Sequence, residues 1–187
     1  MRERELGEVL LRPSAAHRGR AVCVVKMGAG CVGNWVLRED RRPDGAFYFL
    51  LRDNVVDQRL EFAEIDEFIN NYVGPMVGIV QGIRTHRRFV ENVREVPGAL
   101  EDQHRMGRGF AYAFAEMGTV SKPPLYCIFT SGAGKRYRFN LHFTNSAVYM
   151  RLPVYRPSSP TRTQYVWVEC RNAEQLSQAV KKHASQN

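Results

Sequence analysis

The order of the predicted elements constrains the fold most: two stretches of the chain each contain short β-rich segments followed by one amphipathic helix. Turn residues separate the β-rich segments. The strands expected in the first stretch span residues 8–11, 21–27, 35–39 and 46–51. The strands expected in the second stretch span residues 125–130, 136–143, 148–154 and 165–170. Runs of strands followed by helices are typical of α+β proteins, so the sequence predicts two α+β modules, at residues 1–95 and 96–187.

An amphipathic apolar stripe predicts the helix of the first stretch. The stripe consists of Ile65, Phe68, Ile69, Tyr72, Val73, Met76, Val77 and Val80. Gly74 and Pro75 interrupt it, because proline cannot donate the backbone hydrogen bond that a helix interior needs. We expect a kink or a restart there, with Pro75 in the first turn of the second piece.

Two more helices are expected. One lies near residues 98–117, where apolar residues recur at helical spacing, although Gly107 and Gly109 weaken it. The other closes the second stretch from about Asn172. Residues 156–163 are rich in proline and serine and are predicted to form an exposed loop.

The composition is that of a globular protein, with 44% apolar and 25% charged residues. The longest apolar run, residues 46–51, is far too short to cross a bilayer, and no apolar stretch follows the charged amino terminus as a secretory signal would. We therefore expect a protein of the cytosol or nucleus, without a membrane partner. The scattered cysteines are expected to be buried, reduced thiols rather than zinc ligands. They are Cys23, Cys31, Cys127 and Cys170.

The formal net charge of +8 is concentrated in the last third of the chain. Residues 121–187 contain ten lysines and arginines against two acids, Glu169 and Glu174, whereas the first 120 residues are neutral overall. Such an uneven distribution favours an anionic partner for the C-terminal third, although any single lysine can simply be a solvated surface residue.

Two glycine-rich motifs resemble nucleotide sites but lack the required context. Residues 28–33 match G-x-G-x-x-G, yet the β-prone residues 34–37 follow where a dinucleotide site needs a helix. Residues 131–135 end in Gly-Lys, but Phe129 and Arg136 replace the first glycine and the magnesium-binding hydroxyl of a phosphate loop. Both are predicted to be hairpin turns. No catalytic or metal-binding motif is present, so neither an enzyme nor a cofactor is expected.

The first strand is apolar and ends in Arg12, which Pro13 and Ser14 follow. An arginine that emerges from an apolar strand costs several kcal/mol unless an anion or carbonyl groups meet it. A phosphate would suit it, because a guanidinium can bind two phosphate oxygens at once and the following loop supplies further donors. Those donors are Ser14, His17, Arg18 and Arg20. An internal ion pair with Glu39 or another acid is an equally good explanation of this pattern.

The sequence Leu-Leu-Arg-Pro-Ser at residues 10–14, a basic loop, a strand ending at Lys26 and the helix at residues 63–73 resemble a Src-homology-2 (SH2) domain. Together with residues 34–39 and 65–76, the pattern is similar to the tandem SH2 domains of a transcription elongation factor and histone chaperone. The resemblance covers nearly the whole chain and is strongest over residues 7–89. It implies two tandem SH2-like modules, each a small antiparallel sheet flanked by helices.

The resemblance implies a nuclear, monomeric module that binds phosphorylated serine, threonine or tyrosine in the largest subunit of RNA polymerase II, near its C-terminal repeats. By position, Arg12 would grip the phosphate in the first module, with Ser14, Arg20 and Lys26 beside it. Asn34 stands where the family commonly has histidine, so one wall of this site differs.

The second module departs further from the SH2 pattern, because Phe129 or Thr130 stands where the phosphate-binding arginine belongs. The resemblance implies that Arg88 and Lys181, each within a basic cluster, bind phosphoserine there instead. A solvated helix end is the alternative explanation for each.

Two alternatives remain at this point. An SH2 domain normally has a helix before its first strand, so we expect either a fragment of a longer protein or a trimmed first module. The basic C-terminal third also carries interleaved aromatic residues, which would suit weak nucleic-acid binding. These are Tyr137, Phe139, Tyr149, Tyr155, Tyr165 and Trp167.

Overall fold

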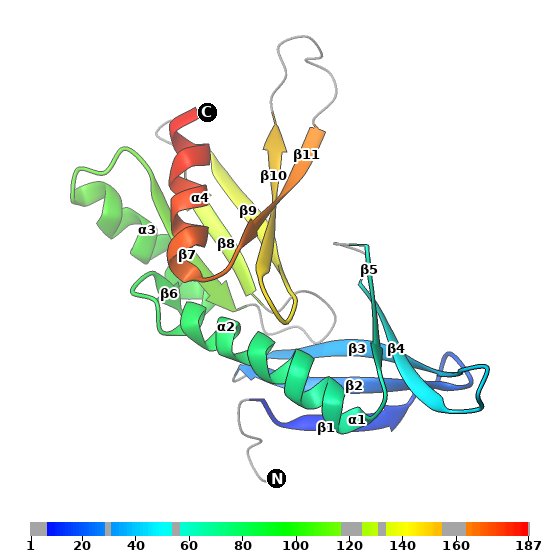
Figure 1. Ribbon diagram of the computed structural model, residues 1–187. Coiled ribbons are helices and arrows are strands. Elements are labelled where there is room, and N and C mark those ends of the chain that lie inside the picture. Colours follow the sequence, from blue (N-terminus) through cyan, green and yellow to red (C-terminus); the bar gives the residue numbers. More distant parts are fainter. Residues whose placement is uncertain are drawn as a thin grey trace, which may run out of the picture.

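The computed structural model describes residues 7–28, 31–53, 57–116, 125–130, 134–154 and 164–186. These residues form two sheets with helices packed on them (Figure 1). The α+β class that the sequence predicts is therefore confirmed.

The first sheet is a five-stranded antiparallel meander whose strands lie side by side in chain order. Its strands are β1 (Val9–Pro13), β2 (Arg20–Gly28), β3 (Cys31–Arg41), β4 (Phe47–Asp53) and β5 (Gln58–Phe62). The sequence did not predict β5, because only Leu60 and Phe62 of this short strand are apolar. A strand rather than a helix follows Gly28, and Gly28 pairs with Cys31, so the predicted hairpin is confirmed.

The helix after this sheet follows one continuous path through α1 (Ile65–Phe68), a π-helical turn η1 (Ile69–Val73) and α2 (Gly74–Arg84). Pro75 lies in the first turn of α2, as predicted. Pro75 has no N–H to donate to the carbonyl of Asn71, four residues earlier. The side-chain Nδ2 of Asn145 donates to that oxygen at 3.1 Å, so a residue from the second half of the chain satisfies it.

The second sheet has the order β11-β10-β9-β8-β7-β6. Its strands are β6 (Phe89–Val90), β7 (Ala111–Glu116), β8 (Leu125–Thr130), β9 (Arg136–Phe143), β10 (Val148–Val154) and β11 (Gln164–Cys170). Thr130 pairs with Arg136, which confirms the second predicted hairpin. The predicted loop at residues 156–163 lies outside the described residues.

The helix predicted at residues 98–117 is wrong in its second half. A short 3₁₀ turn, η2 (Val93–Glu95), leads into α3 (Val96–Arg105), and the chain then turns at Gly107, whose φ is +77°. All six residues of the following strand β7 are buried, between two neighbouring strands and beneath a covering layer on each face. A strand buried on both faces loses the polar alternation that would distinguish it from a buried helix.

Helices cover both faces of the second sheet. The closing helix α4 (Ala173–Gln186) packs Leu176 and Val180 against one face. On the other face, Val96 and Leu100 of α3 pack against Ala113 and Ile128 of β7 and β8.

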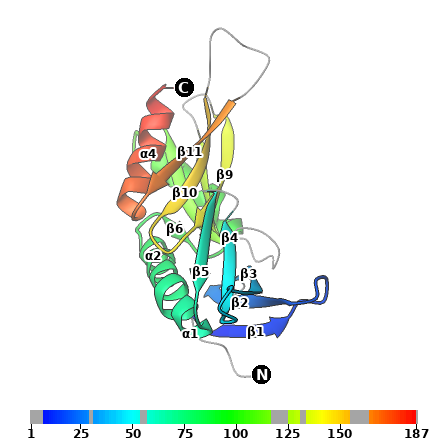
Figure 2. The same ribbon diagram turned by 45° about the vertical axis from the view of Figure 1, so that its right-hand side comes forward.

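One continuous apolar core joins the two sheets, and α2 lies between them (Figure 2). Two side-chain contacts to buried carboxylates also cross from one half to the other. Arg84 at the end of α2 forms an ion pair with the buried Glu116 of β7. His142 Nε2 of β9 lies 2.9 Å from Oδ2 of the buried Asp53 of β4. Such buried pairs are costly to separate, so we expect the two halves to move as one body.

Cys23, Cys127 and Cys170 are buried and unpaired, as predicted. Burial raises the pKa of Cys23 to about 12 and that of Cys170 to about 11, so these thiols stay protonated near neutral pH. Among the described helices, none is long and apolar enough to span a membrane. The described residues also contain no cluster of three or more side chains suited to hold a metal ion.

Candidate functional site

Arg12 lies on the first-sheet face opposite α2. It pairs with Val22, while its neighbour Leu11 pairs with Cys23. Cys23 belongs to the core that α2 covers, and successive side chains of a strand point to opposite faces of the sheet. The guanidinium of Arg12 therefore projects from the uncovered face.

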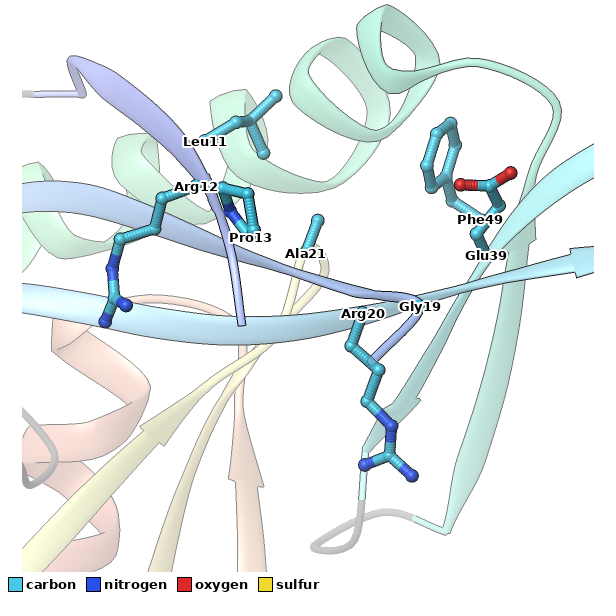
Figure 3. A pocket seen from close by; sticks show the side chains of 8 residues that line it. All are labelled: Leu11, Arg12, Pro13, Gly19, Arg20, Ala21, Glu39 and Phe49. Atoms are coloured by element: carbon cyan, nitrogen blue, oxygen red, sulfur yellow. The ribbon is translucent and has the colours of Figure 1, made fainter. Parts of the chain in front are cut away.

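The side chain of Arg12 is exposed, so the predicted cost of burying its charge does not arise. Strand β1 is the edge of the sheet, and no described helix covers this face, so water can solvate the guanidinium. Within the described part of the chain, Arg12 makes no ion pair or side-chain hydrogen bond. The alternative ion pair with Glu39 does not form, because Glu39 lies on the opposite side of the sheet (Figure 3).

The loop after Arg12 is closed by hydrogen bonds at its base. The backbone N–H of Ser14 donates to the carbonyl of Arg20 at 2.8 Å, and Gly19 has a φ of +74°, a conformation that favours glycine. The hydroxyl oxygen of Ser14 accepts the N–H of His17 at 3.2 Å, which leaves its proton free to be donated. His17, Arg18 and Arg20 are all exposed around this loop.

The other predicted residues of this site share the face of Arg12 but lie at different distances from it. Arg20 is two residues from Val22 along β2, and it pairs with Arg38 of β3, which is held by Asp40. Lys26 is four residues from Val22, roughly 13 Å along the strand. Asn34 of β3 pairs with Val24, between these two positions. The register thus places Arg20 closer to Arg12 than Lys26 is, although the two guanidinium groups extend in different directions (Figure 3).

A groove of about 390 Å³ opens at the ends of β1 and β2, on the other side of the sheet (Figure 3). Its lining is Leu11, Arg12, Pro13, Gly19, Arg20, Ala21, Glu39 and Phe49. The side chains of Leu11, Ala21 and Phe49 lie on the groove side, whereas the guanidinium groups of Arg12 and Arg20 extend away from it. The groove and the two cations therefore occupy opposite faces of one thin sheet.

The second cluster of basic residues surrounds His86, in the turn between α2 and β6. The backbone N–H of Arg88 donates to Nδ1 of His86 at 3.2 Å. The carbonyl of Arg88 accepts the N–H of Phe114 at 2.9 Å, and its guanidinium lies 5.4 Å from the centre of the Tyr112 ring. The predicted residue Arg88 follows the helix rather than ending it, since α2 stops at Arg84.

His86 connects this turn to α4. Its Nε2 lies 3.3 Å from Oγ of Ser177, and that hydroxyl donates to the carbonyl of Ala173 at 2.9 Å. Because Nδ1 accepts a hydrogen bond, the neutral ring carries its proton on Nε2 and donates it to Ser177. Burial lowers the pKa of His86, and the positive charges of Arg87 and Lys181 lower it further, against the opposing effect of Glu174.

The exposed Lys181 lies one turn along α4 from Ser177 and acts electrostatically on His86. Arg88 and Lys181, ninety-three positions apart in the chain, are therefore brought to the same neighbourhood. Sequence reasoning missed His86 and Ser177. The sequence signal that could have pointed to His86 is its position within the basic run of residues 84–88. Its contact with Ser177 on α4 joins distant parts of the chain, so no local pattern indicates it.

Strand β8 differs from β1 at the corresponding position. Phe129 is buried on the α4 side, where its ring lies 6.1 Å from that of His183. Thr130 is half-buried. It lies two residues after Ile128, so its side chain points to the same face of the sheet, the face that α3 covers. The sequence leaves open whether Phe129 or Thr130 takes the position of the phosphate-binding arginine. Arg12 lies on the first-sheet face opposite α2, and Thr130, unlike Phe129, lies on the second-sheet face opposite α4.

Comparison with known proteins agrees with this architecture. The family model of the SH2 domain matches residues 1–147. The structure is similar to the tandem SH2 domain of transcription elongation factor Spt6, described as binding the phosphorylated RNA polymerase II C-terminal repeat domain. The TM-score is 0.69 at 16% identity, covering 95% of this chain and 83% of that chain. The tandem SH2 domains of Antonospora locustae Spt6 give a TM-score of 0.64 at 16% identity, covering 92% and 80%. Among curated protein sequences, none matches this chain.

Proposed function

The chain belongs to the SH2-domain family, and from this premise we propose that it is a pair of tandem SH2 modules that binds phosphorylated segments of RNA polymerase II. The modules span residues 1–95 and 96–187, and the short strand β6 of the first joins the sheet of the second. The phosphorylated partner is the largest polymerase subunit, in its C-terminal repeats or the linker before them. The protein acts as a nuclear, monomeric, non-enzymatic part of a transcription elongation factor and histone chaperone.

The observation that carries this proposal is the state of Arg12. Its guanidinium is exposed on an uncovered sheet face and has no internal counter-charge among the described residues. Arg20 adds a second cation on the same face, and Ser14 retains a proton to donate. A doubly charged phosphate is the ligand that suits two cations and a hydroxyl donor. Asn34 and Lys26 would then contact the peptide farther along the face.

In the second module, Arg88 and Lys181 bind a further phosphate, and phosphoserine is the preferred group there. His86 holds the backbone of Arg88 in place and links it to α4, on which Lys181 lies. Both cations lie at the surface of the molecule rather than in a deep pocket, so water and salt screen their attraction. We therefore expect this site to contribute less affinity than the Arg12 site.

The test is the affinity of the chain for a fluorescein-labelled peptide from the polymerase linker, measured by fluorescence polarisation with and without phosphate. Hydrogen bonds to a charged group contribute about 1.5 to 3 kcal/mol, so Arg12→Ala should weaken binding of the phosphorylated peptide at least about tenfold. Binding of the unphosphorylated peptide should be weak for both proteins.

The matched control is Arg41→Ala, which removes the same charge from an exposed arginine of the same sheet. Arg41 lies at the end of β3, and its guanidinium stacks on Phe47 at 4.4 Å. Alternation along β3 directs Arg41 to the face opposite Arg12. The control should bind like the wild type. Equal affinity of wild type and Arg12→Ala for the phosphorylated peptide would refute the assignment of Arg12.

A further inference from the structure

Two aromatic residues of β11 are unusually exposed for the second sheet. Tyr165 is 52% and Trp167 is 42% exposed, although both lie within a regular strand. Strand β11 is the edge of the sheet and, within the described part of the chain, pairs with β10 alone. Large aromatic side chains left in water in this way mark a surface that binds something.

Both rings lie on the sheet face opposite α4. Trp167 pairs with Arg151, whereas the next residue, Val168, pairs with Met150 in the core beneath α4. On the opposite face, α3 covers β7 and β8 and leaves β10 and β11 uncovered by any described helix. The indole of Trp167 lies 6.4 Å from the ring of His142 on β9, and His142 contacts Asp53 of β4, so the first sheet bounds this face on its inner side.

This open face is also basic. The guanidinium of Arg151 lies 4.6 Å from the centre of the Tyr165 ring, and Arg151 forms no ion pair with any described residue. Arg138 and His142 are four residues apart in β9, so their side chains point to the same face of the sheet. The segment of residues 121–187 holds only two acids. Glu174 acts on His86 at the other side of the sheet, whereas Glu169 shares the face of Tyr165 and Trp167 and interacts with Tyr149, so Arg138 and Arg151 outnumber it there. An anionic partner is therefore attracted to this face.

We propose that Tyr165, Trp167 and Arg151, the β11 platform, bind single-stranded nucleic acid. Every base has a flat face that stacks on an aromatic ring. The guanidinium of Arg151 lies over one face of the Tyr165 ring, so a base would stack on the other face of Tyr165 or on Trp167, and Arg151 could contact the phosphate that follows. The edge position leaves room for a strand to run past β11 without displacing a helix. The platform belongs to a different sheet from Arg12, so this binding would be separate from phosphopeptide capture.

The charge of the face argues for nucleic acid over other occupants. An extended peptide could pair with the free edge of β11, but it would gain nothing from Arg151 and Arg138 unless it were strongly acidic. A second copy of the chain would bring the same positive charges together. A nucleic-acid strand satisfies both the stacking surface and the charge.

The experiment uses the 187-residue chain and a fluorescein-labelled 12-nucleotide oligouridine, with binding followed by anisotropy at 50 mM and 200 mM salt. Stacking contributes about 1 to 3 kcal/mol per base, so Trp167→Ala and Tyr165→Ala should each weaken binding about fivefold or more. Two or three phosphate contacts predict a loss of about 5- to 20-fold in affinity between the two salt concentrations. Trp167 is one of only two tryptophans in the chain, so its fluorescence should be quenched by a stacked base.

Phe47→Ala is the matched control, because Phe47 is 53% exposed and also stacks with an arginine, Arg41 at 4.4 Å, but belongs to the first sheet. It should bind oligouridine like the wild type. Thermal melting of each variant tests its fold, and Trp167→Tyr should keep both the fold and most of the binding.

Three outcomes would overturn the proposal. The first is wild-type protein that does not bind the oligonucleotide at 50 mM salt. The second is binding that Trp167→Ala and Tyr165→Ala leave intact in correctly folded protein. The third is a concentration-dependent dimer, or an unphosphorylated peptide complex, that Trp167→Ala abolishes while oligonucleotide binding is unchanged.

Discussion

Strands β1 and β8 are each followed by three antiparallel strands in chain order, β2 to β4 and β9 to β11, yet the two strands lie in opposite environments. Strand β1 is an edge strand with four of its five residues exposed, and it ends in the unpaired cation Arg12. Strand β8 lies inside its sheet, and five of its six residues are buried. The face that is open beside Arg12 is covered by α3 in the second half.

The difference shows what a strand-held phosphate site requires. A guanidinium needs an open face and water around it until its ligand arrives, because an unpaired buried charge is very costly. The second half has no such face at β8, and the basic residues of its proposed phosphate site, Arg88 and Lys181, lie instead on a turn and on the surface of α4. The comparison predicts that the two halves respond very differently to the same kind of substitution.

The largest effect is expected when an arginine is forced into the second half at Phe129. This ring is 1% exposed and stacks with Tyr137 and Phe139 at 5.1 and 6.1 Å. Phe129→Arg loses this packing and buries an unpaired charge, which together cost about 5 kcal/mol or more. Since a domain is stable by only about 5 to 15 kcal/mol, urea unfolding followed by circular dichroism should show a drastic loss or no folded state.

Thr130→Arg is the control for that experiment, because Thr130 is half-buried and shares the face that corresponds to Arg12. Its long side chain can reach water from the end of β8, so we expect a loss of about 1 kcal/mol. If Phe129→Arg were as stable as Thr130→Arg, the contrast between the buried and the open strand would be refuted.

A smaller effect is expected at the proposed second phosphate site. Arg88→Ala and Lys181→Ala each remove one exposed or partly exposed charge contact, so a phosphoserine peptide should bind about two- to fivefold more weakly. Isothermal titration at low and at physiological salt would measure this, and the loss should shrink as salt rises.

Arg108→Ala is the charge-matched control, since Arg108 is exposed in the turn between α3 and β7 and forms no ion pair with any described residue. It should bind phosphoserine peptide like the wild type. If Arg88→Ala or Lys181→Ala weakened binding as much as Arg12→Ala does, the main phosphate site would lie in the second half instead.

The elements that the sequence predicted best have one-sided patterns. Strands β9 and β10, whose buried and exposed residues alternate, begin and end at the predicted residues, and the stripe from α1 to α2 is buried through Phe68, Tyr72 and Met76. Strand β7 was mistaken for helix, because Ala111–Glu116 is buried on both faces and shows no alternation. The π-helical turn at Ile69–Val73 was not predicted, although a kink or restart was expected at Gly74 and Pro75 directly after it. The hydrogen bond from Asn145 to the carbonyl of Asn71 is a tertiary contact that no local pattern shows.

The candidate site was predictable only in part. The position of Arg12 at the end of a strand could be read from the sequence, but the choice between a ligand and Glu39 depended on strand register, which sets the two on opposite faces. His86 could not be found, because its importance comes from Ser177 on a helix ninety-one positions later. Short-range patterns show which residues are chemically suitable, and only the packed fold shows which of them meet.

The smallest effect concerns pH and distinguishes the second half from the first, because His86 holds the Arg88 turn to α4 through its neutral ring. Burial lowers the pKa of His86 in the folded protein, whereas an unfolded chain has a histidine pKa of about 6.5. The unfolded state therefore binds protons first as pH falls, so stability should be greatest above about pH 6.5 and decline from there toward the depressed folded pKa. His183 behaves in the same direction, since burial lowers its pKa too.

Urea unfolding between pH 7.5 and 5.5 measures this decline in the free energy of unfolding. His86→Gln keeps a side-chain donor for Ser177 but cannot titrate, so it should flatten the pH dependence, and the double variant with His183→Gln should flatten it further. A wild-type protein that grows more stable as the pH falls through this range would contradict the neutral state of His86, and with it the hydrogen bond that fixes Arg88.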